Sequence, residues 1–329
     1  MQLNRLTEGV SYVDGAVSLG LVALDGGGVL LVDAGLEESV GRRVLSLLRT
    51  EGLRLEAILL THSHADHCGG APYLARASGA RVLAPALEGA VVANPVLEPL
   101  YLFGGAAPPA PLRTKFFLAP GVRVDEVVGP GPLTSLGSSA AGPLEVIPLP
   151  GHSLGQVGLK AGEVLFCADA VLAPEVAAKH GVPLNADLAA TLATFDLLLA
   201  RSERWFVLAH GGAVRDADMR SVVEANRLII LETLTLVEDL VRRPLSVEEV
   251  LAEVAQRKGL SLGGLGPYYL FHLTVLAYLG YLVDQGRVTA LYREGRQLFS
   301  AEPSRSSISG PKPPGATSPA SRTPTSGAR

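Results

Sequence analysis

One ten-residue segment constrains this chain more than any other feature of its sequence. Residues 61–70, Thr-His-Ser-His-Ala-Asp-His-Cys-Gly-Gly, place three histidines and an aspartate within six consecutive positions. The whole chain of 329 residues contains only seven histidines, so the clustering does not follow from composition. Imidazole and carboxylate groups are ligands of borderline divalent ions. The segment therefore predicts a metal site formed by His62, His64, Asp66 and His67.

The residues around the cluster indicate how it is presented. Residues 57–60, Ala-Ile-Leu-Leu, form a short apolar run that is typical of a buried strand. Side chains two positions apart in an extended chain point the same way, so His62 and His64 can bind one ion together. The aspartate and the third histidine follow after the chain begins to turn, and they suit a second ion. The two glycines permit a tight turn into a helix expected over residues 71–78.

Five elements of the sequence resemble the metallo-β-lactamase superfamily, whose hallmark is the pattern H-x-H-x-D-H at a strand end. Residues 62–67 carry that pattern, and residues 151–155, Gly-His-Ser-Leu-Gly, are similar to the G-H-[ST]-x-G element of the family. The other three are the strand-ending aspartate in 166–169, the last histidine in 208–212 and the early D-x-G turn in 31–35. All five occur in the order that the family has.

The resemblance implies a dinuclear centre with seven ligands. It assigns His62, His64 and His152 to one ion, Asp66, His67 and His210 to the other, and Asp169 to a bridge between them. Asp66 is in addition the predicted catalytic residue. Zinc is the expected metal for these ligands, with iron or manganese as alternatives. Two such ions about 3.5–4 Å apart lower the pKa of a bridging water from ~15.7 toward ~7, so hydroxide is the expected nucleophile.

Three further polar residues lie outside this ligand set. Asp33 is interpreted either as a carboxylate that orients a ligand histidine or as a simple turn residue before a glycine. His180 follows the strand that ends at Asp169, in a loop whose counterpart often meets substrate in the superfamily, but a surface histidine is the preferred interpretation. His272 is expected to be a hydrogen-bonded core histidine on an apolar helix.

Several positions separate the chain from particular branches of that superfamily. B1-type β-lactamases use a cysteine ligand at the second ion, whereas this chain has His67 and Asp169. Flavodiiron proteins have a glutamate where His64 stands. Quorum-quenching lactonases carry a tyrosine soon after the bridging aspartate, but Val171 and Leu172 follow it here. The lysines and tyrosines that hold glutathione in glyoxalase II have no evident counterpart, so no specialised assignment is supported.

Charge and hydropathy limit the classes of partner. The formal net charge of −4 gives no electrostatic reason to expect nucleic acid or an anionic membrane as a partner. No run of about twenty apolar residues predicts a membrane span, and the first residues lack the apolar core of a signal peptide. Two cysteines form no disulfide framework and suit a reducing compartment. We therefore expect a cytoplasmic protein.

The order of elements predicts an α/β fold. Strands expected over 17–24 and 29–32 and a helix over 37–50 indicate sheets covered by helices, and the resemblance makes this the αββα sandwich of a catalytic domain over 1–222. Residues 84–132 interrupt the pattern, because they are rich in proline and aromatic residues. We expect this insertion to form a lid or a wall of the substrate site; the alternative is an oligomer contact surface.

A second unit is expected over residues 223–302, made of a helical linker and a winged-helix-like domain. Ser246 and Glu249 predict a capping-box start of one helix. A second helix over 267–285 and two short strands around a Glu-Gly turn complete a pattern that resembles a winged helix.

The charge of this second unit argues against DNA binding. From residue 241 to residue 300 there are seven basic and five acidic residues, an excess of only two. We therefore expect packing, dimerisation or one wall of the substrate channel as its role, within a homo-oligomer. Residues 303–329, rich in serine, proline, glycine and threonine, are predicted to be disordered.

Taken together, these features predict a dinuclear metal-dependent hydrolase that acts on a small-molecule ester, thioester or lactone by means of a metal-bridging hydroxide. One alternative is a phosphodiesterase or nuclease on RNA or DNA, which the weak basic character disfavours. Another is a mononuclear iron persulfide dioxygenase, which can keep the same ligand positions. The third is a DNA-binding regulator whose metal domain senses a ligand.

Overall fold

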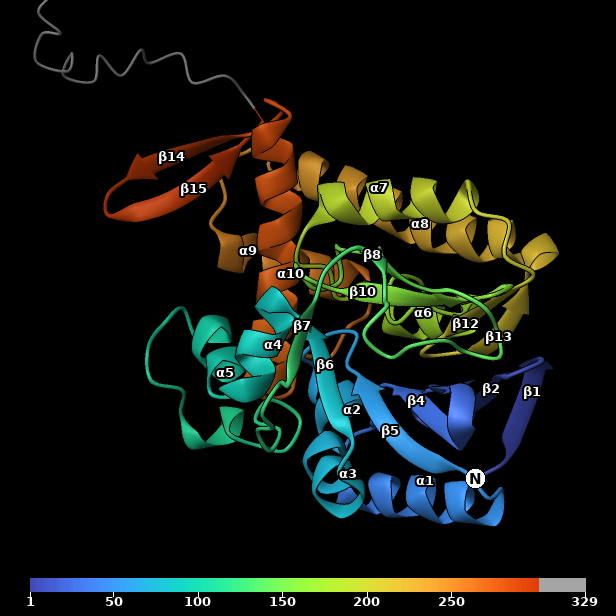
Figure 1. The fold of residues 1–329 in the computed structure, drawn as a ribbon. Coiled ribbons are helices and arrows are strands. Elements are labelled where there is room, and N and C mark those ends of the chain that lie inside the picture. Colours follow the sequence, from blue (N-terminus) through green and yellow to red (C-terminus); the bar gives the residue numbers. More distant parts are fainter. Residues whose placement is uncertain (302–329) are drawn as a thin grey trace, which may run out of the picture.

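Two β-sheets form the centre of the molecule. The computed structural model describes residues 1–301 (Figure 1). The first sheet is antiparallel from its first to its fourth strand and parallel from the fourth to the seventh. Its strands, in spatial order, are β1 (Leu3–Thr7), β2 (Val10–Val13), β3 (Leu19–Ala23), β4 (Gly28–Val32), β5 (Arg54–Leu59), β6 (Arg81–Pro85) and β7 (Glu126–Val128).

The second sheet is antiparallel except for one parallel pair, β11 with β12. Its strands, in spatial order, are β13 (Gly212–Arg215), β12 (Trp205–Leu208), β11 (Val164–Phe166), β10 (Val157–Ala161), β9 (Leu144–Pro148) and β8 (Gly131–Pro132). The parallel pair brings the ends of β11 and β12 to the same edge, where two of the predicted ligands follow.

The two sheets pack face to face, and helices cover their outer faces. In β4, Leu30 joins the core between the sheets with Phe166, while Leu31 joins the core under the outer helices. Strands buried on both faces are continuously apolar, which explains the uninterrupted hydrophobic run of β4. Figure 1 shows the resulting order of layers. The predicted αββα sandwich is confirmed.

Helices of the two outer layers come from different halves of the chain. The first sheet is covered by α1 (Glu38–Thr50) and α3 (Ala71–Ser78), which contribute Val44, Leu48 and Leu74 to the core. The second sheet is covered by α6 (Pro174–His180), α7 (Leu188–Leu199) and α8 (Asp216–Leu240). A short 3-10 helix, η1 (Asp25–Gly27), precedes β4.

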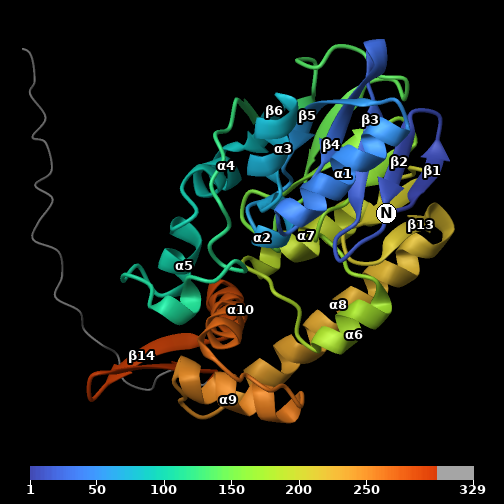
Figure 2. The ribbon, with the colours of Figure 1, turned by 90° about the horizontal axis from the view of Figure 1, so that it is seen from below.

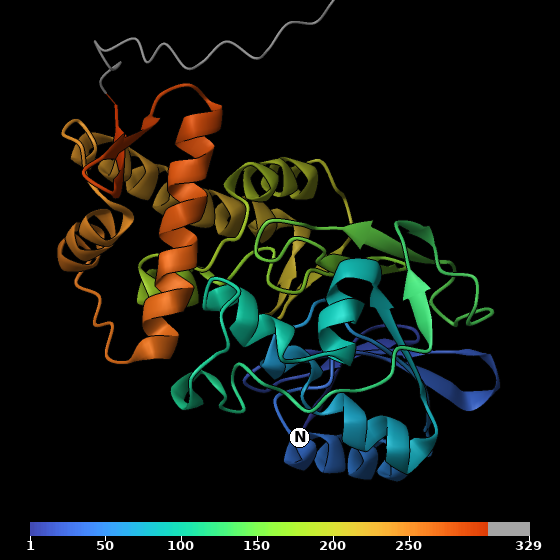
Figure 3. The same cartoon turned by 90° about the vertical axis from the view of Figure 1, so that its left-hand side faces the viewer.

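The proline-rich insertion contains short helices beside the sandwich. They are α4 (Ala86–Ala93), α5 (Leu97–Leu102) and the 3-10 helix η2 (Ala110–Leu112), and they precede β7. Both α5 and η2 contact a helix near the end of the described chain, α10 (Leu265–Asp284). Figures 2 and 3 show α10 beside this insertion. Segments more than 150 residues apart in sequence thus lie side by side.

The C-terminal elements follow the expected order of helix, helix and hairpin. The predicted capping box begins α9 (Val247–Arg257), and α10 is followed by β14 (Thr289–Arg293) and β15 (Arg296–Ser300). The expected boundary near residue 222 lies inside α8, and one hydrophobic core joins side chains before and after it. The winged-helix assignment and the division into two units stay predictions. Residues 303–329 lie outside the described part of the chain.

No helix within residues 1–301 is long and apolar enough to cross a membrane.

Candidate metal centre

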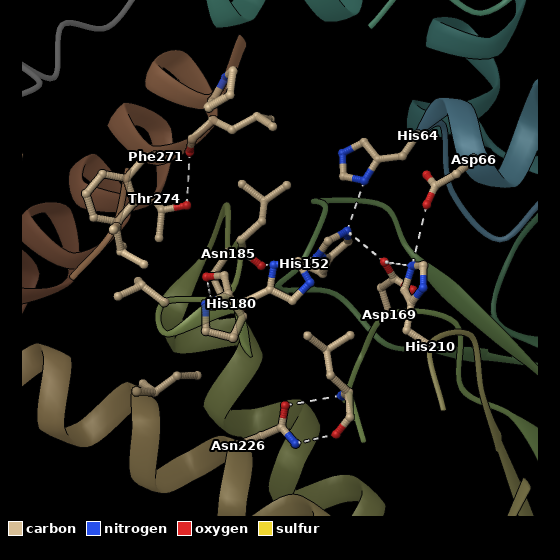
Figure 4. A pocket seen from close by; sticks show the side chains of 18 of the residues that line it. His64, Asp66, His152, Asp169, His180, Asn185, His210, Asn226, Phe271 and Thr274 are labelled. Atoms are coloured by element: carbon tan, nitrogen blue, oxygen red, sulfur yellow. Dashed lines mark hydrogen bonds and ion pairs between the residues drawn. The ribbon is translucent and has the colours of Figure 1, made fainter. Parts of the chain in front are cut away.

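The seven predicted ligands lie together at one edge of the sandwich, although five segments carry them. His62 and His64 follow β5, Asp66 and His67 lie on α2 (Ala65–Cys68), and the others follow β9, β11 and β12. Figure 4 shows five of these side chains directed toward one another: His64, Asp66, His152, Asp169 and His210. β5 ends at Leu59, so the two histidines after it are presented by a loop and not by the extended strand that we expected.

The first group brings three imidazole nitrogens together. Nε2 of His62 lies 3.1 Å from Nδ1 of His64, which lies 2.9 Å from Nε2 of His152. An imidazole nitrogen carries either one proton or one lone pair, so Nδ1 of His64 cannot make two ordinary hydrogen bonds to these neighbours. Three nitrogens around one point are the arrangement of ligands around an ion.

The second group combines imidazoles with carboxylates. Nε2 of His67 lies 3.4 Å from Oδ1 of Asp169 and 4.0 Å from Oδ2 of Asp66. Nε2 of His210 lies 3.5 Å from Oδ2 of Asp66 and 3.6 Å from Oδ2 of Asp169. The latter oxygen is also 3.4 Å from Nε2 of His152. Asp169 therefore lies between the two groups, the position that a bridging carboxylate requires.

Burial keeps His62 and His64 neutral. Burial, followed by the nearby His67 and His64, lowers the pKa of His62 well below its ordinary value. Burial and the neighbouring His152 lower the pKa of His64 to about 3. Neutral imidazoles retain the lone pair with which they bind a metal.

The second group has the opposite electrostatic character. Burial opposes a charge on His67, but Asp169, Asp33 and Asp66 outweigh it and raise the pKa of His67 well above its ordinary value. Burial likewise opposes ionisation of Asp66, yet His67 and His210 lower the pKa of this carboxyl to about 2. The carboxylates are therefore ionised and require positive charge beside them, from protons or from a divalent ion.

Two buried atoms lack the partner that a metal ion would supply. Within the described residues, Nε2 of His67 and Oδ1 of Asp169 are buried without a hydrogen-bond partner, although they lie 3.4 Å apart. An unpaired buried polar atom is costly, so such atoms usually mark a bound water or ion. Their chemistry is that of a nitrogen and a carboxylate ligand. The side chains present fit the divalent ions that the sequence predicts.

The Nδ1 atoms of three predicted ligands, His67, His152 and His210, are held by neighbours. Nδ1 of His67 lies 2.8 Å from Oδ2 of Asp33, whose carboxylate also accepts hydrogen bonds from the backbone and hydroxyl of Thr61. Nδ1 of His152 and His210 lie 3.1 and 2.8 Å from backbone carbonyls. Such contacts select the tautomer in which the remaining nitrogen is free for a metal. Asp33 therefore contacts a ligand histidine, as the first of its two interpretations requires.

A buried glutamate that the sequence analysis missed joins two ligand loops. Oε2 of Glu88 accepts hydrogen bonds from the backbone N–H and the hydroxyl of Ser63, at 3.0 and 2.7 Å. Oε1 accepts from the hydroxyl of Ser153 and the N–H of Gly155, at 2.9 and 2.8 Å. These residues flank His62, His64 and His152 in the chain. A charged residue within the apolar run Ala-Leu-Glu-Gly-Ala-Val-Val-Ala was the signal for it.

The glycines after the cluster are required for packing and not for a turn of unusual backbone conformation. Both have helical backbone angles, with φ of −63° for Gly69 and −81° for Gly70. A Cβ atom on Gly69 would lie 1.9 Å from the carbonyl oxygen of Leu36, and one on Gly70 would lie 2.2 Å from that of Ala34. The glycines form the expected turn into α3, and they also let the loop after β4 pass close to the ligand segment.

A pocket of about 410 Å³ opens from the centre toward the C-terminal helices. Its lining includes His64, Asp66, His152, Asp169 and His210, together with residues of the insertion, α7, α8 and α10. His180 lies at its exposed rim, so this surface histidine also borders the site. The volume falls within the ~300–1,000 Å³ typical of small-molecule sites.

Glu98 of the insertion is a second acidic residue that the sequence analysis missed. It lines the pocket, is only 4% exposed, and its carboxyl makes no hydrogen bond or ion pair within residues 1–301. Burial, Asp66 and Glu88 together raise its pKa well above the ordinary value. His272 is half-buried and stacks on Tyr268, and its ring makes no hydrogen bond in the described structure. The prediction of a hydrogen-bonded core histidine was therefore wrong.

The sequence of the chain matches the Metallo-beta-lactamase superfamily over residues 12–210. The chain belongs to this superfamily. The match includes all seven predicted ligands, from His62 to His210. The family and the sandwich fold predicted from the sequence are thereby confirmed.

Curated relatives of this superfamily member carry the name hydroxyacylglutathione hydrolase. The protein from Methylobacillus flagellatus is 32% identical over 143 residues, which cover 44% of this chain and 43% of the relative. That from Albidiferax ferrireducens is 31% identical over 176 residues, 52% of either chain. The chain thus spans about half the length of the curated relatives that it matches.

Solved metallo-β-lactamase structures share the fold over more of the chain. A beta-lactamase domain protein from Burkholderia ambifaria has a TM-score of 0.69 at 20% identity, covering 91% of this chain and 94% of the other. A metallo-beta-lactamase family protein from Thermus thermophilus has a TM-score of 0.64 at 22% identity, covering 89% and 98%. Both overlaps are longer than residues 12–210, so the structural likeness extends beyond the matched family region.

Proposed function

We propose that this protein is a dinuclear metal-dependent hydrolase of a small ester, thioester or lactone. The observation that carries the proposal is the meeting of two ligand groups around Asp169 at the end of a pocket of small-molecule size. His62, His64 and His152 would hold one ion, and Asp66, His67 and His210 the other. The thioester hydrolases named among the relatives support this reaction class.

The chain's own residues prepare the site for hydrolysis. Divalent ions, most commonly zinc, would supply Lewis acidity and lower the pKa of a water to ~7 when bound. Asp66 borders the pocket with its side chain 39% exposed, and the histidines beside it favour its ionised form. Its place beside the pocket and the predicted ions would let the carboxylate take the proton of a water whose pKa the ions lower. Asp33 and Glu88 keep the ligand side chains and loops in place.

The charges of the C-terminal elements support a small-molecule substrate over nucleic acid. Six of the seven basic residues of this segment form ion pairs with acidic residues: Arg242, Arg243, Arg257, Lys258, Arg287 and Arg296. Binding to a phosphate backbone requires a clustered basic surface whose charges are available. The described pocket lining also contains no lysine or arginine.

The test is metal analysis combined with a substrate panel. Purified protein should contain close to two divalent ions, and removal by a chelator should abolish hydrolysis of a thioester or a lactone. Reloading with zinc, iron or manganese identifies the metal that restores the rate. Preferred cleavage of bis-nitrophenyl phosphate would favour the alternative of a phosphodiesterase. A single bound iron, together with oxygen consumption when a persulfide is added, would establish the alternative of a persulfide dioxygenase.

A further inference from the structure

The pocket has a polar end and an apolar end. Figure 4 shows Asp66, Asp169 and His210 on one side of it, and Phe271 and Thr274 of α10 on the other. The apolar end is built from the insertion, the segment after β11, α8, the loop before α10 and α10 itself. Representative lining side chains are Phe117, Leu172, Ile230, Leu262, Leu270 and Phe271.

Two polar side chains at this apolar end, Asn226 and Thr274, already have partners in the protein. The amide of Asn226 donates to the carbonyls of Leu172 and Val222, and its oxygen accepts from the N–H of Leu172. The hydroxyl of Thr274 donates to the carbonyl of Leu270 at 3.1 Å. These groups are satisfied internally, so this end offers a ligand mainly apolar surface.

The charge of the pocket also selects against anionic ligands. Its described lining includes the carboxylates of Asp66 and Asp169 but no lysine or arginine. A carboxylate or phosphate bound away from the metal ions would have no cationic side chain there to replace its hydration. An uncharged hydrocarbon chain meets no such penalty.

We propose that the apolar end binds the acyl chain of a medium-chain acyl thioester or ester, whose carbonyl lies at the metal end. This inference rests on the proposed hydrolase and names its substrate class. Hydrolysis adds water across the bond between carbonyl carbon and thiol sulfur or alcohol oxygen, and releases a carboxylic acid and a thiol or alcohol. Burial of the acyl chain between α8, α10 and the insertion should raise the affinity for the substrate and the value of kcat/KM.

The first test is a series of N-acetylcysteamine thioesters with acetyl, butanoyl, hexanoyl and octanoyl groups. Each buried methylene should raise kcat/KM roughly fourfold until the pocket is full, since it contributes about 0.8 kcal/mol. A flat or falling series would overturn the acyl site. So would a strong preference for the glutathione thioester of the same acyl group, because that ligand carries charges that the pocket does not match.

Two variants place the effect in the pocket. Leu270→Trp on α10 and Leu262→Trp on the preceding loop should each lower the ratio of octanoyl to acetyl kcat/KM by at least about tenfold, because the larger ring fills the chain's space. Leu276→Trp is the matched control: Leu276 lies on the same helix, is 41% exposed and does not line the pocket. An unchanged ratio in both pocket variants would overturn the assignment.

A binding measurement separates this inference from the proposed function. By calorimetry, octanamide should bind the full-length protein with a negative heat-capacity change, acetamide should not, and Leu270→Trp should weaken octanamide binding at least about tenfold. Octanamide binding without hydrolysis of any ester, thioester or lactone would refute the hydrolase and retain the apolar site. Hydrolysis of acetyl substrates without octanamide binding would refute the acyl site alone.

Discussion

At the scale of single residues, Glu88 affects the metal centre from outside it. Its two carboxylate oxygens receive four hydrogen bonds from the loops that carry His64 and His152. All four donors are N–H or O–H groups, and two of them are backbone groups that can only donate. A neutral amide would place its own NH₂ against one pair of these donors.

Glu88→Gln should therefore weaken metal binding roughly 10–100-fold, the range found for residues that orient ligands. The measurement is competition for zinc with a chromogenic chelator, together with the melting temperature with and without metal. Glu163→Gln is the control, since the Glu163 side chain is 64% exposed and distant from these loops. Equal zinc affinity in all three proteins would contradict the role of Glu88.

The proposed bridging role of Asp169 can be separated from that of a terminal ligand. Asp169→Ala should reduce the metal content at both positions, because its oxygens contact histidines of both groups. His210→Ala should mainly empty the second position, because His210 lies beside Asp66 and the predicted bridge Asp169 and is expected to bind that ion alone. Metal content and turnover of the two variants decide this, and equal metal loss would refute the bridge.

Glu98 should give the metal-depleted protein a measurable pH dependence. The pKa of Glu98 is raised in the folded protein, so folding favours its protonated form. The contribution of that form to the free energy of unfolding is fully present below the pKa of the unfolded state. It is lost as pH rises through the pKa of the folded state. Glu98→Gln should thus raise the melting temperature of the chelated protein by an amount that grows as pH rises above the ordinary pKa of a glutamate. Parallel curves for variant and wild type would contradict this.

At the scale of elements, the ligand segment depends on how closely α2 and α3 approach the loop after β4. Gly69→Ala would bring a Cβ atom to 1.9 Å from a backbone oxygen that can move only with its loop. We expect a loss of about 1–3 kcal/mol in the free energy of unfolding, together with weaker metal binding. Denaturant unfolding measures the first and chelator competition the second.

Gly280→Ala is the matched control for that substitution. Gly280 lies within α10, and a Cβ atom there meets open space. Alanine is the better helix former, so this variant should gain about 0.5–1 kcal/mol without a change in metal affinity. A similar small gain from Gly69→Ala would show that the close approach is not strained.

At the scale of the whole molecule, the C-terminal elements belong to the same core as the second sheet and also line the pocket. Val250, Tyr278 and Leu279 share one hydrophobic cluster with Phe206 and Leu208 of β12. Removing residues from Arg243 onward should therefore expose apolar surface and change the oligomeric state, the substrate range or both. Light scattering and the acyl series measure these, and an unchanged mass with an unchanged acyl preference would contradict the prediction.

The sequence alone predicted the ligand set of the candidate metal centre. The pattern from His62 to His67 is local, and the other ligand motifs can be read without knowledge of distant contacts because each one follows an apolar strand. The capping box at Ser246 was readable for the same reason, since its two hydrogen bonds join residues three positions apart.

Only the tertiary structure decided what surrounds these motifs. Glu88 meets Ser153 across 65 positions, and α10 meets the insertion across more than 150. Such contacts arise from the packing of whole elements; the lone charge of Glu88 in an apolar run is a local signal, but no local pattern identifies its partners. The acyl pocket depends on them, because its walls come from segments whose apolar side chains are indistinguishable in sequence from ordinary core residues.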